Sequence, residues 1–299
     1  MSDSTVALAA GVALVAGAGW AVARAVWRRG EEPARSLRVV ITGSSRGLGY
    51  ALAREHLRLG DSVLVCGRSA EAVEQAKRGL AELVTSPSQR LASHVCDVSS
   101  PSGCDSLARE ATSSLGGIDL WVNNAGVTQH PRQVLWATPA ESVASIVGIN
   151  LIGTMLGCRA ALNVMIPQGH GCVFNMDGRG ARGEGTPLSA VYGASKAAIP
   201  QLGKTLAKEL PKGSGCSVHT ASPGMVTTGL LMKGASPSTL KLFNILAETP
   251  ETAAAWLVPR MRAAVDQPSG KYISYLTPAG VVWRFATAPW RKDRLFKVD

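Results

Sequence analysis

The sequence contains no closely spaced pair of cysteines. Its six cysteines are scattered, and several lie within apparent strands: Cys66, Cys96, Cys104, Cys158, Cys172 and Cys216. This spacing argues against a disulfide framework and against a metal site. We therefore interpret the cysteines as small core residues in a reducing compartment.

Zinc-finger and aromatic RNA-binding patterns are also missing, although the chain carries a net charge of +10. The lysines and arginines are spread along the sequence rather than gathered in one block. We therefore favour an anionic cofactor and a membrane surface over nucleic acid as the reason for the basic balance. With 299 residues, of which 46% are apolar, the chain can bury a sizeable core in one large α/β domain or two small ones.

Charged residues are absent from Thr5 to Ala23, and Arg24 follows with two further arginines close behind. At about 1.5 Å per residue, a helix of this length just crosses the apolar core of a bilayer. No cation precedes the run, which fits a cleaved signal peptide poorly, and no arginine precedes Arg24, which fits a transit peptide poorly. We predict an apolar or transmembrane helix over residues 1–29 and a linker over residues 30–36. The alternative is an apolar tail that frays or docks.

A short apolar strand from Leu37 to Ile41 leads directly into a glycine-rich turn. A strand, such a turn and a following helix, here from about Leu48 to Leu59, form a phosphate site. Glycine is needed because a pyrophosphate must approach main-chain N–H groups without a Cβ in the way, and the helix N-terminus adds its positive dipole end. For the glycines alone, a tight strand-to-helix turn is the alternative. The candidate cofactor residues of this turn are Gly43, Ser45, Arg46, Gly47, Leu48 and Gly49.

A second strand, Asp61 to Cys66, ends in Gly67 and Arg68. In dinucleotide-binding folds the end of this strand meets the adenosine ribose, where an acidic residue binds the 2′-hydroxyl of NAD. This chain has Arg68 there and Arg46 in the glycine turn, so two guanidinium groups could converge on a 2′-phosphate. We therefore predict NADPH rather than NADH. The alternative for each arginine is a solvated surface side chain.

Two further strand ends carry candidate cofactor residues. A carboxylate just after the third strand, Leu91 to Cys96, can accept a hydrogen bond from the adenine amino group. The amides and the glycine after the fourth strand, Ile118 to Val122, suit main-chain bracing and close packing on the cofactor ribose, or equally an ordinary turn. The candidates at these ends are Asp97, Val98, Asn124, Ala125 and Gly126.

A third group of candidates lies on helices. Tyr192 and Lys196 are four residues apart near the start of an apolar helix that continues to Leu210, so both side chains share one face. An ammonium there favours tyrosinate and is expected to lower the tyrosine pKa from its ordinary value of about 10, which makes the phenol a proton donor near neutral pH. Asn150 lies within a largely helical stretch from Thr138 to Met165, where an asparagine is usually a packing residue.

The last part of the chain contributes a turn, two helices, a strand and a tail. A strand from Cys216 to Ala221 leads into a turn that would pass over a nicotinamide. Leu230 to Leu246 and Pro250 to Val265 are predicted as helices, and Lys271 to Leu276 is predicted as the last strand. The tail, residues 280–299, mixes aromatic with basic residues, which fits either a helix packed on the domain or a membrane interface. The candidate cofactor residues of the turn are Pro223, Gly224, Val226 and Thr227.

Taken in order, these motifs make the chain resemble the short-chain dehydrogenase/reductases from about Leu37 to Leu276. The resemblance implies an α/β protein with a single doubly wound parallel sheet, a Rossmann fold, here preceded by the N-terminal apolar helix. It implies NADP(H) along the strand ends in a reductase domain over residues 37–279. It also implies Tyr192 as proton donor or acceptor, Lys196 as its pKa partner and ribose ligand, and Asn150 as part of a proton relay.

One departure from the family pattern concerns a serine that usually lies shortly before the tyrosine and polarises the substrate carbonyl. Asp177, Gly178 and Arg179 occupy that neighbourhood here. The stretch resembles the chlorophyll b reductases, which also lack the serine. The segments that carry this resemblance are Val173–Gly178, Thr186–Leu188, Ser222–Met232, Glu248–Met261 and Tyr275–Pro278.

This resemblance implies an NADPH-dependent carbonyl reductase that converts the 7-formyl group of chlorophyll b, or of chlorophyllide b, to a hydroxymethyl group. It also implies a chloroplast thylakoid membrane with the domain on the stromal side, and a homo-oligomer or a hetero-oligomer with related reductases. The glycine-rich loop from Asp177 to Gly185 would leave room for a flat macrocycle. Two other functions fit the residues: a reductase of a lipid ketone, retinoid or steroid on the cytosolic side of the endoplasmic reticulum membrane, and a non-catalytic NADP-binding subunit.

Overall fold

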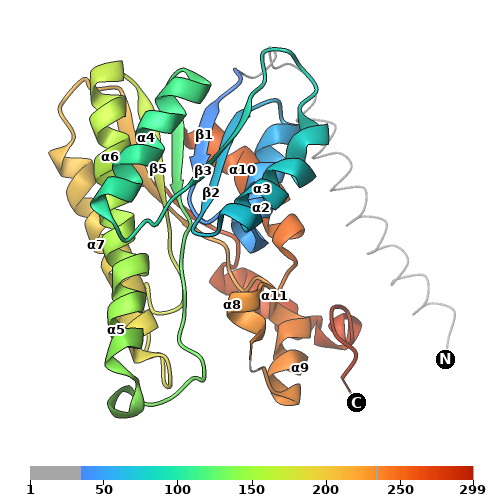
Figure 1. The fold of residues 1–299 in the computed structure, drawn as a ribbon. Coiled ribbons are helices and arrows are strands. Elements are labelled where there is room, and N and C mark those ends of the chain that lie inside the picture. Colours follow the sequence, from blue (N-terminus) through green and yellow to red (C-terminus); the bar gives the residue numbers. More distant parts are fainter. Residues whose placement is uncertain (1–34, 234, 299) are drawn as a thin grey trace, which may run out of the picture. The chain divides into compact units, whose positions relative to one another are not determined.

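The computed structural model describes residues 35–233 and 235–298. Their centre is a seven-stranded parallel sheet in the order β3-β2-β1-β4-β5-β6-β7 (Figure 1). The strands are β1 (Arg38–Ile41), β2 (Ser62–Gly67), β3 (Leu91–Val95), β4 (Leu120–Asn123), β5 (Gly171–Met176), β6 (Cys216–Ser222) and β7 (Tyr272–Ser274). The predicted doubly wound parallel sheet is confirmed. The predicted N-terminal helix, residues 1–29, lies outside the described residues.

Helices cover both faces of the sheet, as a fully buried parallel sheet requires. Alternate residues of a strand point to opposite faces. Val39 and Ile41 of β1 therefore join one core with α2 (Gly47–Arg58) and α10 (Pro250–Ala264). Val40 joins the other core with α4 (Pro101–Leu115) and α6 (Gly153–Gln168). The helices are α2 (Gly47–Arg58), α3 (Ala70–Leu80), α4 (Pro101–Leu115), α5 (Ala140–Val147), α6 (Gly153–Gln168), α7 (Ala190–Glu209), α8 (Gly229–Met232), α9 (Pro237–Leu246), α10 (Pro250–Ala264) and α11 (Pro278–Ala286).

The strand order reverses between β1 and β4, which are neighbours in the sheet although β2 and β3 lie between them in the sequence. In open parallel sheets the loops beyond the carboxyl ends of the strands diverge at such a point and leave a crevice for a ligand. The glycine turn follows β1 and Asn124 follows β4. The fold therefore brings two of the predicted motifs to the same place.

One predicted helix is divided. The stretch from Leu230 to Leu246 contains the short α8 and then α9, because Pro237 has no N–H to continue a helix and instead occupies the first turn of α9. The hydroxyl of Ser236 caps the new helix by accepting a hydrogen bond from the N–H of Thr239 at 3.3 Å. The prediction of a single helix there is wrong.

The helical run from Ala140 to Gln168 comprises α5, a π-helical turn (Gly148–Ile152) and α6. Among the described residues it is the one run that is long and apolar enough to cross a membrane. Ala160, Ala161 and Met165 of α6 are buried against the sheet and α4. The run therefore serves as an internal helix of the domain.

A buried acidic side chain ties the first strand to two helices. Asp61 accepts a hydrogen bond from the N–H of Leu37 at 2.8 Å and contacts Nδ1 of His56, on α2, at 2.7 Å. Arg262 of α10 pairs with the same carboxylate. Burial raises the pKa of Asp61, but the hydrogen bonds and charges of His56 and Arg262 outweigh burial and hold that pKa below its ordinary value. The network fixes α2, which begins in the glycine turn, against α10.

Candidate active site

The glycine turn is shaped by contacts that leave no room for side chains. Gly43 has a φ of +64°, and a Cβ on it would lie 2.9 Å from the Cα of Ala125. A Cβ on Gly49 would clash with the carbonyl oxygen of Gly43 and the side chain of Asn124. The turn after β1 and the turn after β4 therefore pack main chain against main chain. We call this arrangement the glycine cradle. Because no side chains intervene, a pyrophosphate can closely approach the main-chain N–H groups of the turn.

Hydroxyl groups that the sequence analysis did not single out hold this turn in place. Oγ1 of Thr42 accepts hydrogen bonds from the N–H groups of Asn124 and Ala125, both at 2.9 Å, and Nδ2 of Asn124 donates to the carbonyl of Thr42 at 2.9 Å. Oγ of Ser44 donates to the carbonyl of Ile41 at 2.6 Å and accepts from the N–H of Cys66 at 2.8 Å. The only signal for them in the sequence is their position beside Gly43.

The first turn of α2 is available to an anion. Arg46 occupies the N-cap position with extended backbone, its side chain does not cap the helix, and the first turn contains no acidic residue. Main-chain N–H groups at such a helix start have no partner within the helix. Gly47 has a φ of +59° and lies against Thr228, so the loop after β6 reaches this turn.

The two arginines predicted to select NADPH lie on adjacent loops. A Cβ on Gly67 would lie 2.8 Å from Oγ of Ser45, so the end of β2 contacts the glycine turn, and the neighbouring Arg46 and Arg68 are both exposed. Asp97 lies at the next strand end. Hydrogen bonds from the side chain and N–H of Ser99, aided by the charge of Arg68, lower the pKa of Asp97.

Val98 differs from the other candidates because it is a buried packing residue. Its side chain fits against Gly153 at the start of α6, where a Cβ would lie 2.9 Å from a methyl group of Val98. This contact sets the distance between the loop after β3 and the helical run that carries Asn150.

Asn150 lies in the π-helical turn and joins three elements. Its Oδ1 accepts a hydrogen bond from the N–H of Val127 at 2.8 Å, and its Nδ2 donates to the carbonyl of Val127 at 3.0 Å and to Oγ of Ser195 at 3.1 Å. A Cβ on Gly126 would lie 3.5 Å from Oδ1 of Asn150 and 3.8 Å from Nζ of Lys196. The asparagine is thus both a satisfied buried residue and a neighbour of the lysine; its role in a proton relay stays a prediction.

Lys196 and Tyr192 share one face of α7, as predicted. Nζ of Lys196 is buried and donates a hydrogen bond to the carbonyl of Met176, at the end of β5, at 3.0 Å. Burial lowers the pKa of Lys196 to about 8, and the negative charge of Asp177 opposes that change. Lys196 therefore still carries its proton at neutral pH.

The predicted lowering of the Tyr192 pKa is wrong in this arrangement. Burial raises the pKa of Tyr192 to about 12, and the charge of Asp177 adds to the effect, while Arg132 opposes it. The charges that act on this pKa are those of Asp177 and Arg132, and burial is the largest effect, so burial decides the direction. Tyr192 remains a protonated phenol over the whole neutral range, which suits a proton donor in a reduction.

Gly178 stands opposite the tyrosine hydroxyl. A Cβ on Gly178 would clash with Oη of Tyr192 and lie 3.5 Å from Cε of Lys196. Its neighbour Asp177 is buried, accepts a hydrogen bond from Oη of Tyr272 at 2.5 Å, and has its pKa raised by burial. Sequence reasoning missed Tyr272, which lies on β7, two strands from Asp177 at the end of β5.

The loop after β6 is braced by Glu248. The N–H of Thr227 donates to the carbonyl of Glu248 at 2.9 Å, and the N–H of Glu248 donates to the carbonyl of Met225 at 2.9 Å. Gly224 has a φ of +72° and lies against Leu276. The loop that carries Pro223, Gly224, Val226 and Thr227 thus adjoins both the glycine turn and the segment after β7; the cofactor contacts of these four residues stay predictions.

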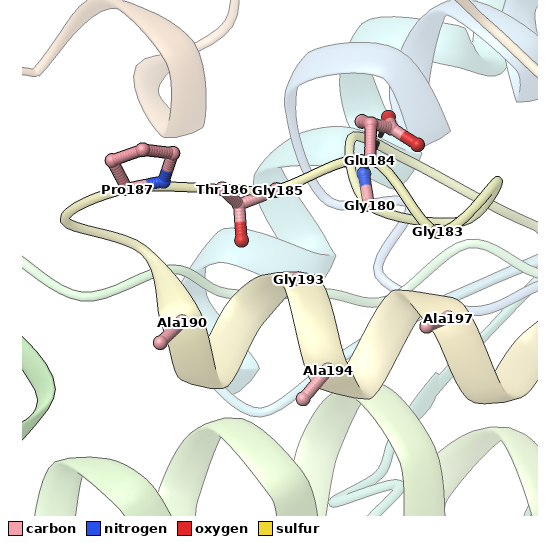
Figure 2. A pocket seen from close by; sticks show the side chains of 10 residues that line it. All are labelled: Gly180, Gly183, Glu184, Gly185, Thr186, Pro187, Ala190, Gly193, Ala194 and Ala197. Carbon is pink, nitrogen blue, oxygen red and sulfur yellow. Dashed lines mark hydrogen bonds between the residues drawn. The ribbon is translucent and has the colours of Figure 1, made fainter.

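An open pocket of about 460 Å³ is lined by residues of the glycine-rich loop and of α7 (Figure 2). Small residues line it, among them Gly183, Ala190, Ala194 and Ala197. At 100° per residue these alanines lie on the side of α7 opposite Tyr192, so the pocket is separate from the tyrosine hydroxyl. The space that the loop leaves is therefore not at the reacting centre.

The fold and the glycine cradle define a nicotinamide-dependent oxidoreductase. A family model described as short chain dehydrogenase matches residues 38–238. The chain therefore belongs to the short-chain dehydrogenase family. A solved structure of a metagenomic short-chain oxidoreductase in complex with NADP matches with a TM-score of 0.64 at 25% sequence identity, covering 81% of this chain and 98% of that one.

Among the curated relatives are two chlorophyll(ide) b reductases from Arabidopsis thaliana. The chain is 43% identical over 272 residues to a chloroplastic protein named probable chlorophyll(ide) b reductase, with 86% of this chain and 54% of the relative covered. It is 42% identical over 249 residues to a second chloroplastic chlorophyll(ide) b reductase, with 80% and 70% covered. The predicted resemblance is confirmed. The chain spans about half the length of the first relative.

Proposed function

We propose that the protein reduces the 7-formyl group of chlorophyll b, or of chlorophyllide b, to a hydroxymethyl group with NADPH. The observation that carries this proposal is the similarity to chlorophyll(ide) b reductases over most of the chain, including the stretch in which Asp177 and Gly178 replace the usual serine. The cradle of Gly43 and Gly49 beside a Tyr192 and Lys196 pair supports the same reaction class.

The residues divide the chemistry between them. A nicotinamide cofactor supplies a hydride to the aldehyde carbon when it is bound. Tyr192 is a neutral phenol and donates its proton to the oxygen that becomes an alkoxide. Lys196, held by the carbonyl of Met176, stabilises the tyrosinate that remains, and Asn150 holds the loop after β4 and Ser195 in position.

Gly178 gives this site its particular shape. The main chain of Gly178 packs directly against Oη of Tyr192, and a Cβ at this position would clash with the hydroxyl. The glycine therefore lets the phenol lie against the loop after β5.

The preference for NADPH is part of the proposal. Arg46 and Arg68 are exposed on adjacent loops, and no acidic residue occupies the first turn of α2. Two guanidinium groups suit a 2′-phosphate, which carries more negative charge than a ribose hydroxyl. The candidate adenine ligand is Asp97, whose neighbour Arg68 also lies near the ribose position.

The proposed location is the chloroplast thylakoid membrane, with the catalytic domain on the stromal side and an N-terminal apolar helix as the anchor. The chloroplastic relatives and the uncharged run before Arg24 support it. An oligomer with itself or with related reductases is part of the same proposal. The endoplasmic reticulum membrane is the alternative location.

The test uses the full chain in detergent with NADPH and chlorophyll b or chlorophyllide b, followed by absorption and product chromatography. We expect loss of the formyl pigment and stoichiometric oxidation of NADPH. Tyr192→Phe removes the proton donor and should lower turnover by about 100-fold to 10,000-fold while leaving NADPH binding intact. Tyr50→Phe, on α2 against Gly79 of α3, is the matched control.

Each other outcome favours a different function. Turnover of a lipid ketone, a retinoid or a steroid, with no change in the pigment, would point to the second reductase function. Tight NADPH binding without turnover of any carbonyl compound, and a biological role that survives Tyr192→Phe, would point to a non-catalytic subunit.

A further inference from the structure

The C-terminal segment, residues 278–298, is fastened to the domain by arginines that point inward. Arg284, Arg291 and Arg294 each form an ion pair with Glu248, at 3.0, 3.0 and 2.7 Å. Because Glu248 also pairs with the main chain of Met225 and Thr227, these arginines connect the segment to the loop after β6. The segment is therefore a fixed part of the domain.

The end of α9 offsets the remaining positive charge of these arginines. Arg284 donates to the carbonyl of Leu246 at 2.7 Å, and Arg291 donates to that of Ile245 at 2.8 Å. The last carbonyls of a helix lack partners within the helix and carry the negative end of its dipole. Asn244 adds hydrogen bonds to the main chain of Leu295 and Phe296. The basic side chains thus serve internal packing.

The aromatic side chains of the same segment point the other way. The exposed fractions are 82% for Trp290, 70% for Val282, 66% for Trp283 and 48% for Phe285, and Leu242 of the neighbouring α9 is also exposed. We call these five residues the aromatic surface. A fixed segment that directs arginine inward and tryptophan outward reverses the usual pattern, and large exposed apolar patches mark sites of interaction.

Most of the charged side chains exposed on the segments that carry the aromatic surface are positive. Lys233, Lys241 and Lys292 are exposed, as is Asp293, and neither Gly229–Leu246 nor Pro278–Arg291 contains an aspartate or glutamate. Helices α8, α9 and α11 lie together at one end of the domain (Figure 1), and α11 packs on α9. This end of the domain therefore presents tryptophan, aliphatic groups and lysine to solvent.

We propose that the folded domain docks on an anionic lipid bilayer through the aromatic surface, independently of any N-terminal anchor. Tryptophan is enriched where membrane meets water, and lysine beside it is attracted to anionic headgroups. A contact with a second copy of the chain fits less well, because the same surface on two copies would bring lysines of like charge together. If the proposed function holds, docking also brings the loop after β6 close to a membrane-held pigment.

The test measures quenching of tryptophan fluorescence in the full chain by vesicles of phosphatidylglycerol and brominated phosphatidylcholine. The wild type is compared with Trp283→Phe/Trp290→Phe, which keeps the surface apolar. Because every other tryptophan is common to both proteins, the difference in quenching reports on positions 283 and 290. We expect a clear quenched component in the wild type that the double variant lacks. Equal quenching in both proteins would overturn the proposal.

A second variant measures the contribution to binding. Trp283→Ser/Trp290→Ser should weaken the salt-sensitive part of binding to vesicles containing phosphatidylglycerol by about tenfold or more, because two large apolar side chains no longer enter the interface. An N-terminal anchor contributes equally to both proteins. Leu59→Ser/Val95→Ser removes two exposed apolar side chains elsewhere and is the matched control. Replacement of the anionic lipid by phosphatidylcholine, or addition of salt, should weaken binding of the wild type.

The outcomes separate this proposal from the proposed function. The quenching experiment needs neither NADPH nor pigment, so a failure to reduce chlorophyll b leaves it unaffected. Turnover of detergent-solubilised pigment by Trp283→Ser/Trp290→Ser should equal that of the wild type. Light scattering compares the oligomeric states of the wild type and this variant. If the variant forms a smaller oligomer than the wild type but binds vesicles equally well, the aromatic surface is a self-interface and the proposal is wrong.

Discussion

Tyr272 of β7 donates a hydrogen bond to Oδ2 of Asp177 at 2.5 Å, across the strand that lies between them. Arg182 of the glycine-rich loop lies over the ring of Tyr272, with its guanidinium carbon 5.1 Å from the ring centroid, and its Nε donates to the same hydroxyl at 3.4 Å. The residue that follows β5 is therefore linked both to the sheet edge and to the loop beside Tyr192.

The first prediction concerns the pH dependence of reduction. The groups that face Asp177 are Tyr272 from β7, Ser222 from β6, Arg182 from the loop, and Tyr192 and Lys196 from α7. Removing the negative charge in Asp177→Asn takes away an effect that raises the pKa of both Tyr192 and Lys196. Both values fall, so the alkaline limit of kcat/KM should move to lower pH.

The measurement for this prediction is kcat/KM for NADPH-dependent reduction between about pH 6 and 11, a range that brackets the Lys196 pKa of about 8. Tyr272→Phe is the matched comparison, because it keeps the carboxylate and removes the hydrogen bond that lowers the pKa of Asp177. It should leave the alkaline limit near that of the wild type. An unchanged alkaline limit in Asp177→Asn would show that Asp177 acts only on loop structure.

A second prediction tests the close contact between Gly178 and the hydroxyl of Tyr192. Gly178→Ala places a methyl group against Oη of Tyr192, so the phenol must shift. A displacement of about 1 Å at a reacting group costs on the order of 100-fold in rate, and we expect a loss of kcat of that size. Gly178→Ser should also fail to improve activity, because its Cβ meets the same hydroxyl.

Gly185→Ala is the control for Gly178→Ala, since a Cβ on Gly185 in the same loop meets no atom within 4 Å. The melting temperature and NADPH affinity of each variant separate loss of catalysis from loss of folding. Full activity in Gly178→Ala would show that the phenol has freedom to move, contrary to the packing seen here.

A third prediction concerns the choice of cofactor. Arg68→Ala removes a positive charge at the predicted 2′-phosphate position, and hydrogen bonds to charged groups contribute about 1.5–3 kcal/mol. NADPH affinity should therefore fall by roughly tenfold to a hundredfold, while NADH affinity changes little. Arg58→Ala, at the other end of α2, should leave both affinities unchanged. Equal loss for the two cofactors in a titration of their fluorescence would contradict this role of Arg68.

A fourth prediction concerns stability. Asp61→Asn removes the charge of the buried carboxylate that pairs with Arg262, and breaking a buried ion pair costs about 3–5 kcal/mol. Asp105→Asn, which loses a more exposed ion pair with Arg159 at 2.9 Å, should cost about 0–1 kcal/mol. Urea denaturation of both variants measures the difference.

The pH dependence of the Asp61 effect has a defined sign. The folded pKa of Asp61 lies below its unfolded value, so its contribution is fully present above the unfolded pKa of about 3.9 and is lost as the pH falls through the folded pKa. The stability gap between wild type and Asp61→Asn should therefore narrow in acid. A gap that stays constant down to low pH would rule out the carboxylate charge as its source.

Local sequence patterns predicted most of the elements correctly. The apolar run of β1, the glycines after it and the spacing of Tyr192 and Lys196 depend on neighbours a few residues away, and the structure has each where it was expected. The boundaries of the elements are predicted less well. The sequence pattern predicts one helix from Leu230 to Leu246, but in the structure Pro237 begins a separate helix.

The sequence by itself therefore determined the family, the parallel sheet and the motifs at its strand ends, because strand, turn and helix preferences act over short distances in the chain. The tertiary structure alone decided three other matters. It joined Asp177 to Tyr272, it turned the arginines of the C-terminal segment onto Glu248, and it raised the pKa of Tyr192 that the lysine was expected to lower. Each depends on side chains far apart in the sequence and on how completely a group is buried, and residue spacing carries neither kind of information.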